Sequence, residues 1–330
     1  MNVLLTGGAG FIGSNLTRYW LAAHPEDRVT VFDLLTYAGR RESLVDLEAN
    51  SRYRFVRGDV ANPEDVREAL RGSDLVLHLA AETHNDRAIS DPTPFVRTNV
   101  VGTATLLEAC RTLDIPRAHF VSTDEVFGSL ELGEPRRFDE DSPYCPRGPY
   151  SASKAAADHL VRAWHTTYGL PVTLSNCSNN FGPYQFPEKL IPLAITNLLR
   201  KERVPLYGDG RNVRDWIYVE DHCAALDLIA RRGRPGATYL VSAETELSNV
   251  ELLERLVRLV GSTSDQIERV TDRPGHDRRY ALDPRRVREE LGWSPGHPFD
   301  AALQATVDWY RAHRAWWEPL RASAVGKAEA

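Results

Sequence analysis

The glycine-rich turn near the start of the chain constrains its fold more than any other feature. Thr6-Gly7-Gly8-Ala9-Gly10-Phe11-Ile12-Gly13 directly follows the apolar run Val3-Leu4-Leu5 and opens a helical pattern that continues to about Ala23. Glycines at these positions permit a tight turn and let a pyrophosphate approach the N-terminus of the helix. A strand, a turn and a helix in this order predict a dinucleotide-binding unit. The alternative is a glycine-rich turn that binds no ligand.

Short apolar runs alternate with helical patterns throughout the first half of the chain. The runs begin at residues 3, 29, 53, 75 and 118, and we expect helices at about 11–23, 63–71, 94–113 and 150–168. This alternation is typical of a parallel sheet with right-handed crossovers. We therefore predict an α/β fold, a Rossmann-type doubly wound parallel sheet with a smaller C-terminal substrate-binding lobe.

The alternation ends after about residue 176. The segment 179–187 is so rich in glycine, proline and asparagine that we expect no regular element there. A strand near Tyr239, a helix at about 248–260, a loop at 272–277 and two final helices are expected after it. We predict that residues 1–176 form the cofactor-binding domain, rejoined by about 212–237, and that residues 177–211 and 238–330 form the second lobe.

Composition excludes several classes of protein. A hydrophobic content of 42% supports a sizeable core, and a net charge of -6 provides no basic stripe for nucleic acid. Cys110, Cys145, Cys177 and Cys223 are scattered without metal-binding spacing, so we expect reduced thiols and no metal site. No apolar run is long enough to span a membrane, and the strand pattern starts too early to leave room for a signal segment. We therefore expect a cytoplasmic location.

Asp33 indicates which dinucleotide the chain binds. It ends the second apolar run, roughly 20 residues after the glycines, where a carboxylate bonds a ribose 2′-hydroxyl and repels a 2′-phosphate. NAD is therefore expected rather than NADP, and the alternative role for Asp33 is a cap or turn residue. Gly58-Asp59-Val60 ends the third run and is a candidate for the adenine pocket, or an ordinary loop.

The candidate reacting centre combines two carboxyl groups with a tyrosine and a lysine. Thr123-Asp124-Glu125 follows the apolar run that starts at Ala118, at the strand end where open α/β sheets bind ligands. Both carboxyl groups can reach one substrate only if the chain bends after Val121. Tyr150 and Lys154 are four residues apart, so on a helix they share one face and the ammonium favours the phenolate. The alternative for Thr123 and Asp124 is capping of the next helix.

The motifs together resemble a known family. The glycine spacing is similar to that of the short-chain dehydrogenases/reductases, and further motifs resemble the dTDP-glucose 4,6-dehydratases, an extended branch of that group. These motifs span nearly the whole chain: Leu79-Ala80-Ala81-Glu82-Thr83-His84, Ser122-Thr123-Asp124-Glu125-Val126-Phe127-Gly128, Tyr150 with Lys154, Asn179-Asn180-Phe181-Gly182-Pro183-Tyr184-Gln185, Pro187-Glu188-Lys189-Leu190-Ile191-Pro192, Asn212-Val213-Arg214-Asp215-Trp216 and Arg273-Pro274-Gly275-His276-Asp277.

The resemblance implies a redox-neutral dehydration by a hydro-lyase. Tyr150 would take the proton of the sugar C4 hydroxyl while hydride leaves C4 for NAD, with Thr123 bonding the same oxygen. Glu125 would then remove the C5 proton, and Asp124 would protonate the departing C6 hydroxyl. Hydride would return to C6, giving a nucleotide-linked 4-keto-6-deoxyglucose for deoxysugar biosynthesis. Asp124 must be protonated and Glu125 ionised, as two neighbouring carboxyls in different environments can be.

The resemblance also implies two sets of binding residues. Those expected to hold NAD are Gly7, Gly10, Phe11, Ile12, Gly13, Asp33, Leu34, Thr36, Asp59, Val60, Leu79, Ala80, Ala81, Thr98, Tyr150, Lys154 and Asn180. Those expected to hold the nucleotide sugar are Thr83, Thr123, Asn179, Lys189, Leu190, Pro205, Leu206, Tyr207, Arg214, Asn249, Arg273 and His276. The forked guanidinium of Arg214 and the point charge of Lys189 suit a diphosphate, although either can be an ordinary surface charge. His276 is alternatively a local hydrogen-bonding group, and the asparagines are alternatively turn formers.

The chain departs from the family pattern at a few positions. Phe127 and Phe181 stand where tyrosine is frequent, and Ser242-Ala243 replaces a glycine pair. Thr83 and Asn85 vary the His-Val-Asp-Arg-Ser pattern. We expect none of these changes to touch Asp124, Glu125, Tyr150 or Lys154. They affect the choice of nucleotide or sugar instead.

Several functions share this NAD site and tyrosine–lysine pair. UDP-glucose 4,6-dehydratases, nucleotide-sugar 4-epimerases and UDP-glucuronate decarboxylases are alternatives, and Asp124 argues against the last two because neither needs an acid at C6. A catalytically silent NAD-binding scaffold is the alternative from another class. Apolar side chains on the two helices at about 94–113 and 150–168 favour a homodimer, or burial within one chain.

Overall fold

A seven-stranded sheet forms the centre of the molecule. The computed structural model describes residues 1–272 and 275–325. All neighbouring strands of this sheet are parallel, in the order β10-β6-β5-β4-β1-β2-β3. Their bounds are β1 Asn2–Thr6, β2 Arg28–Asp33, β3 Tyr53–Arg57, β4 Leu75–His78, β5 Ala118–Thr123, β6 Val172–Cys177 and β10 Thr238–Val241. The predicted Rossmann-type doubly wound sheet is confirmed.

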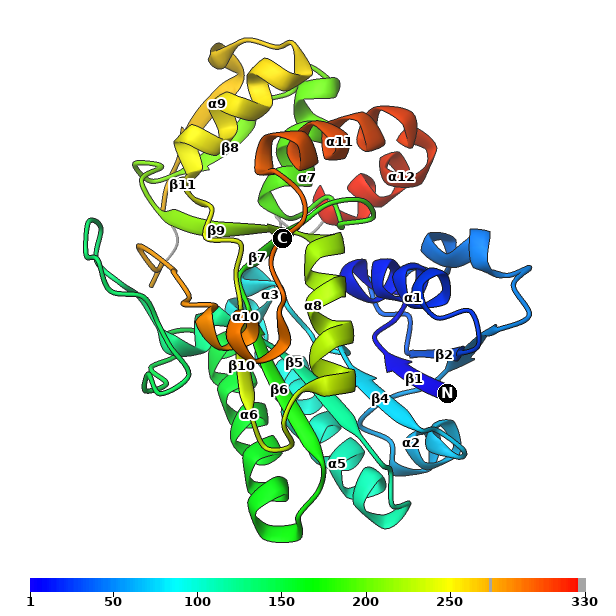
Figure 1. The fold of residues 1–330 in the computed structure, drawn as a ribbon. Coiled ribbons are helices and arrows are strands. Elements are labelled where there is room, and N and C mark those ends of the chain that lie inside the picture. The colour runs from blue at the N-terminus through cyan, green and yellow to red at the C-terminus, as the bar shows by residue number, and fades with distance from the viewer. Residues whose placement is uncertain (273–274, 326–330) are drawn as a thin grey trace.

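Helices cover both faces of this sheet (Figure 1). On one face α2 (Pro63–Leu70), α5 (Gly102–Thr112) and α6 (Pro149–Tyr168) pack side by side, and on the other α1 (Phe11–Ala23) packs against α8 (Val219–Arg232). Alternate strand residues feed the two cores because successive side chains point to opposite faces. Leu5 and Val31 therefore belong to one buried cluster, while the adjacent Leu4 and Phe32 belong to the other.

The helical pattern at 94–113 divides into three parts. A short α4 (Thr93–Phe95) leads into the π-helical η2 (Val96–Val101), which continues as α5. A π turn widens a helix and is frequent near functional sites. Asn99 lies in this turn, fully buried, and its side chain bonds both the N–H and the carbonyl of Glu82 and the hydroxyl of Ser153. The turn thus joins the loop after β4 to α6.

Most of the remaining elements lie at the opposite end of Figure 1 from the body of the sheet, whereas α10 (Arg285–Leu291) packs beside β10 and α8. A three-stranded sheet has the order β11-β9-β7, and a parallel pair joins β12 to β8. These strands are β7 Asn179–Phe181, β8 Val204–Tyr207, β9 Val213–Tyr218, β11 Glu246–Ser248 and β12 Ile267–Val270. The helices are α7 Leu190–Leu199, α9 Asn249–Val260, α10 Arg285–Leu291, α11 Phe299–Ala312 and α12 Arg314–Val325. Shorter helices elsewhere are η1 Arg41–Leu47, α3 Asn85–Ser90, η3 Asp124–Phe127 and η4 Ser264–Gln266.

Three expectations about this part of the chain were wrong. The segment 179–187 begins with the strand β7, because pairing with β9 supplies the hydrogen bonds that its composition does not favour. Three helices rather than two follow residue 277, since α11 and α12 meet at a sharp turn near His313. The strand expected to open the second lobe, β10, pairs with β6 and is an edge of the central sheet.

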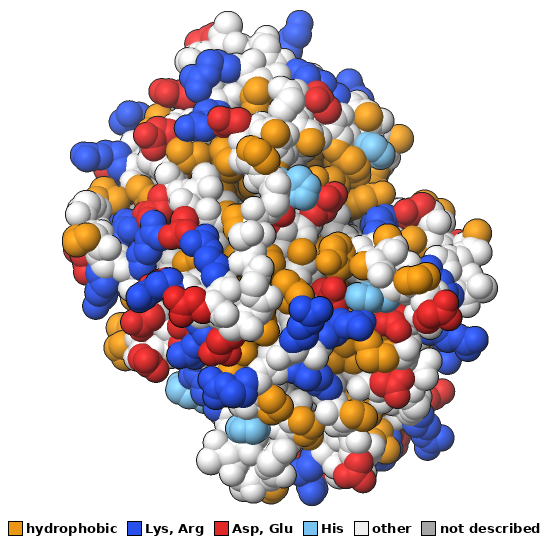
Figure 2. All heavy atoms as spheres, viewed as in Figure 1, with side chains coloured by type: hydrophobic (Ala, Val, Ile, Leu, Met, Phe, Trp, Pro, Cys, Tyr) orange, Lys and Arg blue, Asp and Glu red, His pale blue; other side chains and the backbone are white. Residues whose placement is uncertain are grey.

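Charged side chains of both signs are interspersed over the face shown in Figure 2. This face therefore has no extended patch of one sign. Within the described ranges, no helix combines the length and apolar character needed to cross a membrane.

Candidate active site

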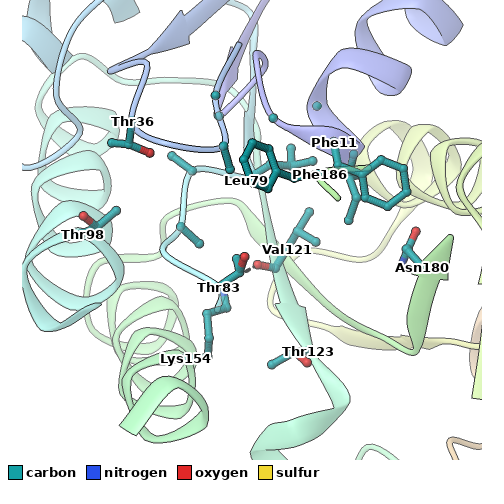
Figure 3. Close-up of a pocket in the computed structure, with 18 of the residues that line it drawn as sticks. Phe11, Thr36, Leu79, Thr83, Thr98, Val121, Thr123, Lys154, Asn180 and Phe186 are labelled. Carbon is teal, nitrogen blue, oxygen red and sulfur yellow. Dashed lines mark hydrogen bonds between the residues drawn. The ribbon is translucent and has the colours of Figure 1, made fainter. Parts of the chain in front are cut away.

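A single pocket gathers the predicted cofactor and reacting residues at the carboxyl ends of the central strands. Every residue predicted to hold NAD lines it, and so do Thr123, Asp124, Glu125, Tyr150 and Lys154. Figure 3 shows Phe11, Thr36 and Thr98 at one end, and Thr123 and Lys154 at the other. This is the edge of an open parallel sheet where ligands bind. The sequence predicted the location because strand ends that meet at one edge bring distant motifs together.

The glycine turn between β1 and α1 packs too closely against neighbouring backbone to accept side chains at two of its glycines. Gly7 has a positive φ of 69°, and a Cβ added there would lie 2.6 Å from the backbone nitrogen of Ala80. A Cβ added at Gly13 would lie 2.3 Å from the carbonyl oxygen of Gly7. Glycine at these positions therefore allows the tight turn, and Gly7, Gly10 and Gly13 line the pocket at the N-terminus of α1, which fits the pyrophosphate of a dinucleotide.

Asp33 serves the local turn and the pocket together. Its Oδ2 accepts from the N–H of Ala9 at 3.0 Å, and its Oδ1 accepts from the N–H of Leu35 at 2.8 Å. These bonds join the end of β2 to the glycine turn. Asp33 therefore does act as a turn residue, which was the alternative role for it. Burial raises the pKa of Asp33 while the two backbone bonds oppose the rise. The side chain also lines the pocket, where carboxylate lone pairs can accept a ribose hydroxyl.

The strand β5 ends at Thr123, and η3 supplies the bend that the two carboxyl groups require. The Thr123 hydroxyl accepts from the N–H of Glu125 at 3.3 Å and donates to Oδ1 of Asp124 at 3.2 Å. Thr123 is therefore an N-cap, as the alternative held, and it also lines the pocket. The cap fixes the turn that points both carboxyl groups away from the sheet.

Asp124 lies in an environment that favours its neutral form. Burial, and next the nearby Glu125, raise its pKa well above the usual range. Its Oδ2 is buried and makes no hydrogen bond to any residue that the structure describes. A neutral carboxyl group with an unused oxygen facing a pocket is suited to donate a proton.

Glu125 is half-buried, and several groups favour its ionised form. Burial raises its pKa, whereas a hydrogen bond from Asn85 and the charges of Lys189 and Arg214 lower it. Asn85 Nδ2 donates to Glu125 Oε2 at 3.1 Å. The expectation that no departure from the family pattern touches the reacting residues was therefore wrong. The two neighbouring carboxyl groups differ in the donors around them, as acid and base roles require.

Tyr150 and Lys154 lie one turn apart on α6, and both side chains are buried. Lys154 Nζ donates to the carbonyl of Val121 at 2.7 Å (Figure 3). Burial, followed by the charge of Glu125, raises the pKa of Tyr150 well above its usual range, and a bond with Thr123 opposes this. The expected lowering by Lys154 is not found, because burial dominates. Burial also lowers the pKa of Lys154, and the buried Asp158 opposes that change.

The residues predicted to hold the nucleotide sugar divide into two groups. Thr83, Asn179 and Lys189 line the pocket, and the buried Oδ1 of Asn179 has no hydrogen-bond partner within the described ranges. Others lie beyond the pocket lining, on α7, β8, β9 and α9 or, for His276, in a loop: Leu190, Pro205, Leu206, Tyr207, Arg214, Asn249 and His276. Arg273 lies outside the described residues.

Three of the residues that lie beyond the pocket lining make contacts with other parts of the protein. The Arg214 guanidinium lies 4.3 Å from the ring centre of Tyr280 and donates to the carbonyl of Asp277 at 3.0 Å. The Leu206 side chain packs in the main core cluster, so only its backbone is available to a ligand. His276 Nδ1 lies 2.6 Å from Asp272 Oδ1, which realises the alternative of a local hydrogen bond.

Comparison with known proteins identifies the family. The model of the family described as GDP-mannose 4,6 dehydratase matches residues 4–306. The chain belongs to this family. Relatives that are similar over nearly the whole chain include two dTDP-glucose 4,6-dehydratases. Mycobacterium tuberculosis (strain H37Rv) dTDP-glucose 4,6-dehydratase is 53% identical over 97% of this chain and 96% of its own length. That of Streptomyces niveus is 48% identical over 97% and 96%.

Solved structures agree with this family assignment. One is the crystal structure of the Streptomyces venezuelae dTDP-glucose 4,6-dehydratase with NAD and dTDP bound. It matches this chain with a TM-score of 0.94 and 48% sequence identity, and the match covers 97% of this chain and 100% of that one. A Thermus thermophilus UDP-glucose 4-epimerase with NAD has a TM-score of 0.87 and 31% identity, covering 95% and 100%. The resemblance read from the motifs is confirmed, and the fold alone does not separate dehydratase from epimerase.

This dehydratase-family pocket also contains residues that sequence reasoning did not select. Ser178, Gln185, Phe186 and Glu188 line it, and the buried Ser178 hydroxyl has no hydrogen-bond partner in the described part of the chain. Cys177, taken for a structural thiol, lines it as well. Their position in the sequence could have indicated them, since Gln185 and Glu188 lie within two motifs that carried the resemblance and the other three lie within two residues of these motifs.

Glu188 closes the pocket near the cofactor end. Its Oε1 accepts from the Tyr37 hydroxyl at 2.9 Å, and its Oε2 lies 3.5 Å from the Arg87 guanidinium. The same guanidinium lies 3.6 Å from the ring centre of Tyr37. This Tyr37–Arg87–Glu188 cluster joins the segment after β2, the helix α3 and the segment before α7 across the pocket. It links these three segments beside the pocket, which Glu188 lines.

Proposed function

We propose that this chain is an NAD-dependent dTDP-glucose 4,6-dehydratase that converts dTDP-glucose to dTDP-4-keto-6-deoxyglucose in deoxysugar biosynthesis. The observation that supports this most is the pairing of the buried Asp124 with the half-buried Glu125 in the pocket that Tyr150 also lines. Burial raises the pKa of Asp124 well above its usual range, whereas Glu125 accepts a hydrogen bond from Asn85 and lies near the charges of Lys189 and Arg214. An oxidation alone needs neither group, and an elimination needs both.

The residues of this pocket have separate tasks in the proposed reaction. Tyr150 accepts the proton of the C4 hydroxyl, and Thr123 donates a hydrogen bond to the same oxygen. Lys154 holds the end of β5 through Val121 and keeps a positive charge beside Tyr150. NAD supplies the hydride acceptor for C4 and the hydride returned to C6, so the reaction consumes no oxidant.

The ketone at C4 acidifies the C5–H bond, which Glu125 breaks by taking the proton. Asp124 delivers its proton to the C6 hydroxyl, which leaves as water. Glu125 then returns a proton to C5 as C6 is reduced. At the end of the cycle Glu125 has returned its proton, Tyr150 holds the proton from the C4 hydroxyl, and Asp124 has given one to the departing water. Tyr150 then loses a proton to solvent and Asp124 gains one from solvent, so the proton count closes.

The substrate nucleotide is the part of this proposal with the least support from the pocket itself. Arg214 and Lys189 suit a diphosphate, and β8 with its flanking residues suits a base, but neither feature selects thymine. The identity to dTDP-glucose 4,6-dehydratases favours dTDP over UDP or CDP. We propose also that residues 1–176 with 212–241 hold NAD and that the rest holds the nucleotide sugar.

A cytoplasmic homodimer is part of the same proposal. Ile89, Val96, Val101 and Tyr168 are exposed apolar side chains on α3, η2 and α6. A second copy of the chain covering them would bury this apolar surface. Light scattering of the purified protein tests this, and a mass equal to one chain contradicts it.

Incubating the purified protein with dTDP-glucose in deuterated water tests the function. A dehydratase gives a 4-keto-6-deoxy sugar with deuterium at C5, because Glu125 exchanges its proton with solvent. An epimerase gives the galactose isomer, and a silent scaffold leaves the substrate unchanged. Comparing dTDP-, UDP- and CDP-glucose in the same assay identifies the nucleotide. A ketosugar without deuterium at C5 contradicts the role of Glu125.

A further inference from the structure

The side chain of Asn85 reaches the proposed base from a separate helix. Asn85 is the first residue of α3, and its Nδ2 donates to Glu125 Oε2 at 3.1 Å across 40 positions of sequence. The family pattern has valine at this position, and a valine side chain has no donor. The contact is therefore a property of this chain rather than of the pattern that it resembles.

Glu125 needs such a donor because its surroundings otherwise disfavour a charge. Burial is the largest influence on its pKa, and it raises the pKa; the Asn85 bond is the largest influence that lowers it. Titratable and charged groups face Glu125 from every neighbouring element: Asp124 of η3, Tyr150 of α6, Lys189 before α7, Arg214 of β9, and Asp277 and Tyr280 after residue 275.

The two cations among these groups are expected to act differently once substrate is bound. Lys189 and Arg214 lower the pKa of Glu125 through their charge. In the proposed function both residues face the diphosphate of the nucleotide sugar, whose negative charge offsets theirs. Asn85 carries no charge to be offset, so its donated hydrogen bond favours the carboxylate equally with and without substrate.

We propose that Asn85 is a positioning residue for Glu125, holding Oε2 by its amide so that the ionised carboxylate presents Oε1 to the C5 proton. This inference rests on the proposed function. An ionised carboxylate can only accept, so the amide presents its NH₂ group to it. Anchoring one oxygen also removes rotational freedom from a side chain that must meet the substrate in one orientation.

Three variants test the proposal. Asn85→Leu keeps the size of the side chain and removes the donor, and Asn85→Asp keeps the shape and replaces the donor with an acceptor. Ser90→Ala, at the exposed end of α3, is the matched control. Each is assayed for kcat/KM of ketosugar formation across pH, and its fold is checked by thermal unfolding.

Loss of the donor should raise the pKa of Glu125 and move the acidic limb of the profile to higher pH. For Asn85→Leu we expect a shift of about one unit, equivalent to a rate about tenfold lower on that limb. Asn85→Asp should shift the limb further, since a second carboxylate repels the first. Rates on the plateau and the KM should change little, and Ser90→Ala should match the parent protein.

Two results would overturn the proposal: an acidic limb that stays in place in both Asn85 variants, or a loss that is equal at every pH, as a merely structural role would give. If Asn85→Leu does not fold, the isosteric Asn85→Asp decides. Infrared difference titration of the Glu125 carboxylate, with Glu125→Gln as reference, gives the same pKa shift without turnover. The infrared titration therefore tests this inference independently of the proposed function. The proposed function itself fails only if the parent protein makes no ketosugar.

Discussion

Replacing Asp124 with asparagine should separate the two halves of the proposed reaction. Asparagine has the same shape as a neutral carboxyl group and keeps a hydrogen-bond partner for Thr123, which lies 3.2 Å from Asp124 Oδ1. It cannot release a proton to the departing C6 hydroxyl. General acid catalysis contributes about 10²–10⁴-fold, so elimination should slow by about a thousandfold, or roughly 4 kcal/mol of barrier.

The oxidation of C4 does not use Asp124 and should change little. A stopped-flow experiment with dTDP-glucose measures both events, because reduced nicotinamide absorbs in the near ultraviolet and the ketosugar is detected after quenching. In Asp124→Asn the reduced cofactor should accumulate before product appears. An equal loss of both steps would refute the assignment of Asp124 as the acid for C6.

The same substitution should affect stability with a predictable sign. Burial raises the pKa of Asp124 well above its usual value of 3.8, so between the unfolded-state and folded-state pKa values the folded state binds a proton that the unfolded state has released. The free energy of unfolding of the parent protein therefore falls as pH rises through this range. Asparagine removes that loss, so Asp124→Asn should be as stable as the parent at about pH 3 and more stable at neutral pH. Urea unfolding at both pH values measures this difference. If the stability of the variant relative to the parent is lower at neutral pH than at acid pH, the result contradicts a neutral Asp124.

Three further changes test the cofactor end of the pocket. Tyr37→Phe removes a hydrogen bond to the carboxylate of Glu188, which is worth about 1.5–3 kcal/mol. NAD should therefore dissociate at least about tenfold faster. Unchanged retention of NAD through gel filtration would argue against this. Asp33→Asn should weaken NAD binding and relieve repulsion of a 2′-phosphate, so the ratio of NADP to NAD affinity measured by calorimetry should rise; a constant ratio would count against Asp33 as the selecting residue. Gly13→Ala places a Cβ 2.3 Å from the carbonyl oxygen of Gly7, so the variant should melt at lower temperature and fail to bind NAD, and normal binding would show that the turn can relax.

The parts of the fold that could be predicted from sequence are those specified by local pattern. Continuous apolar runs flanked by turns are typical of buried parallel strands, and the glycine turn marks the first crossover. These two patterns together were enough to predict a central parallel sheet. Strand β7 could not be found in this way, because its hydrogen bonds come from β9, more than thirty positions later, and its own composition favours a turn. The edge strand β10 was seen as a strand but assigned to the wrong sheet, since periodicity identifies an element without identifying its neighbour.

The candidate site shows the same division at the level of charge. The positions of Asp124, Glu125 and Tyr150 follow from motif and sheet topology, but their protonation states depend on groups that the chain brings in from elsewhere. The sequence rule that a lysine one turn from a tyrosine lowers its pKa failed for Tyr150 because burial outweighs a single neighbouring charge. From the sequence, Asn85 was expected to leave the catalytic residues unaffected. Its hydrogen bond is, however, the largest influence that opposes the rise in the pKa of Glu125 caused by burial.

A substitution near an active site is therefore better judged by which ionisable group it can reach than by whether it changes a catalytic residue. For this pocket, that criterion predicts that exchanging Asn85 for the valine of the family pattern changes the pH dependence of elimination before it changes the choice of substrate.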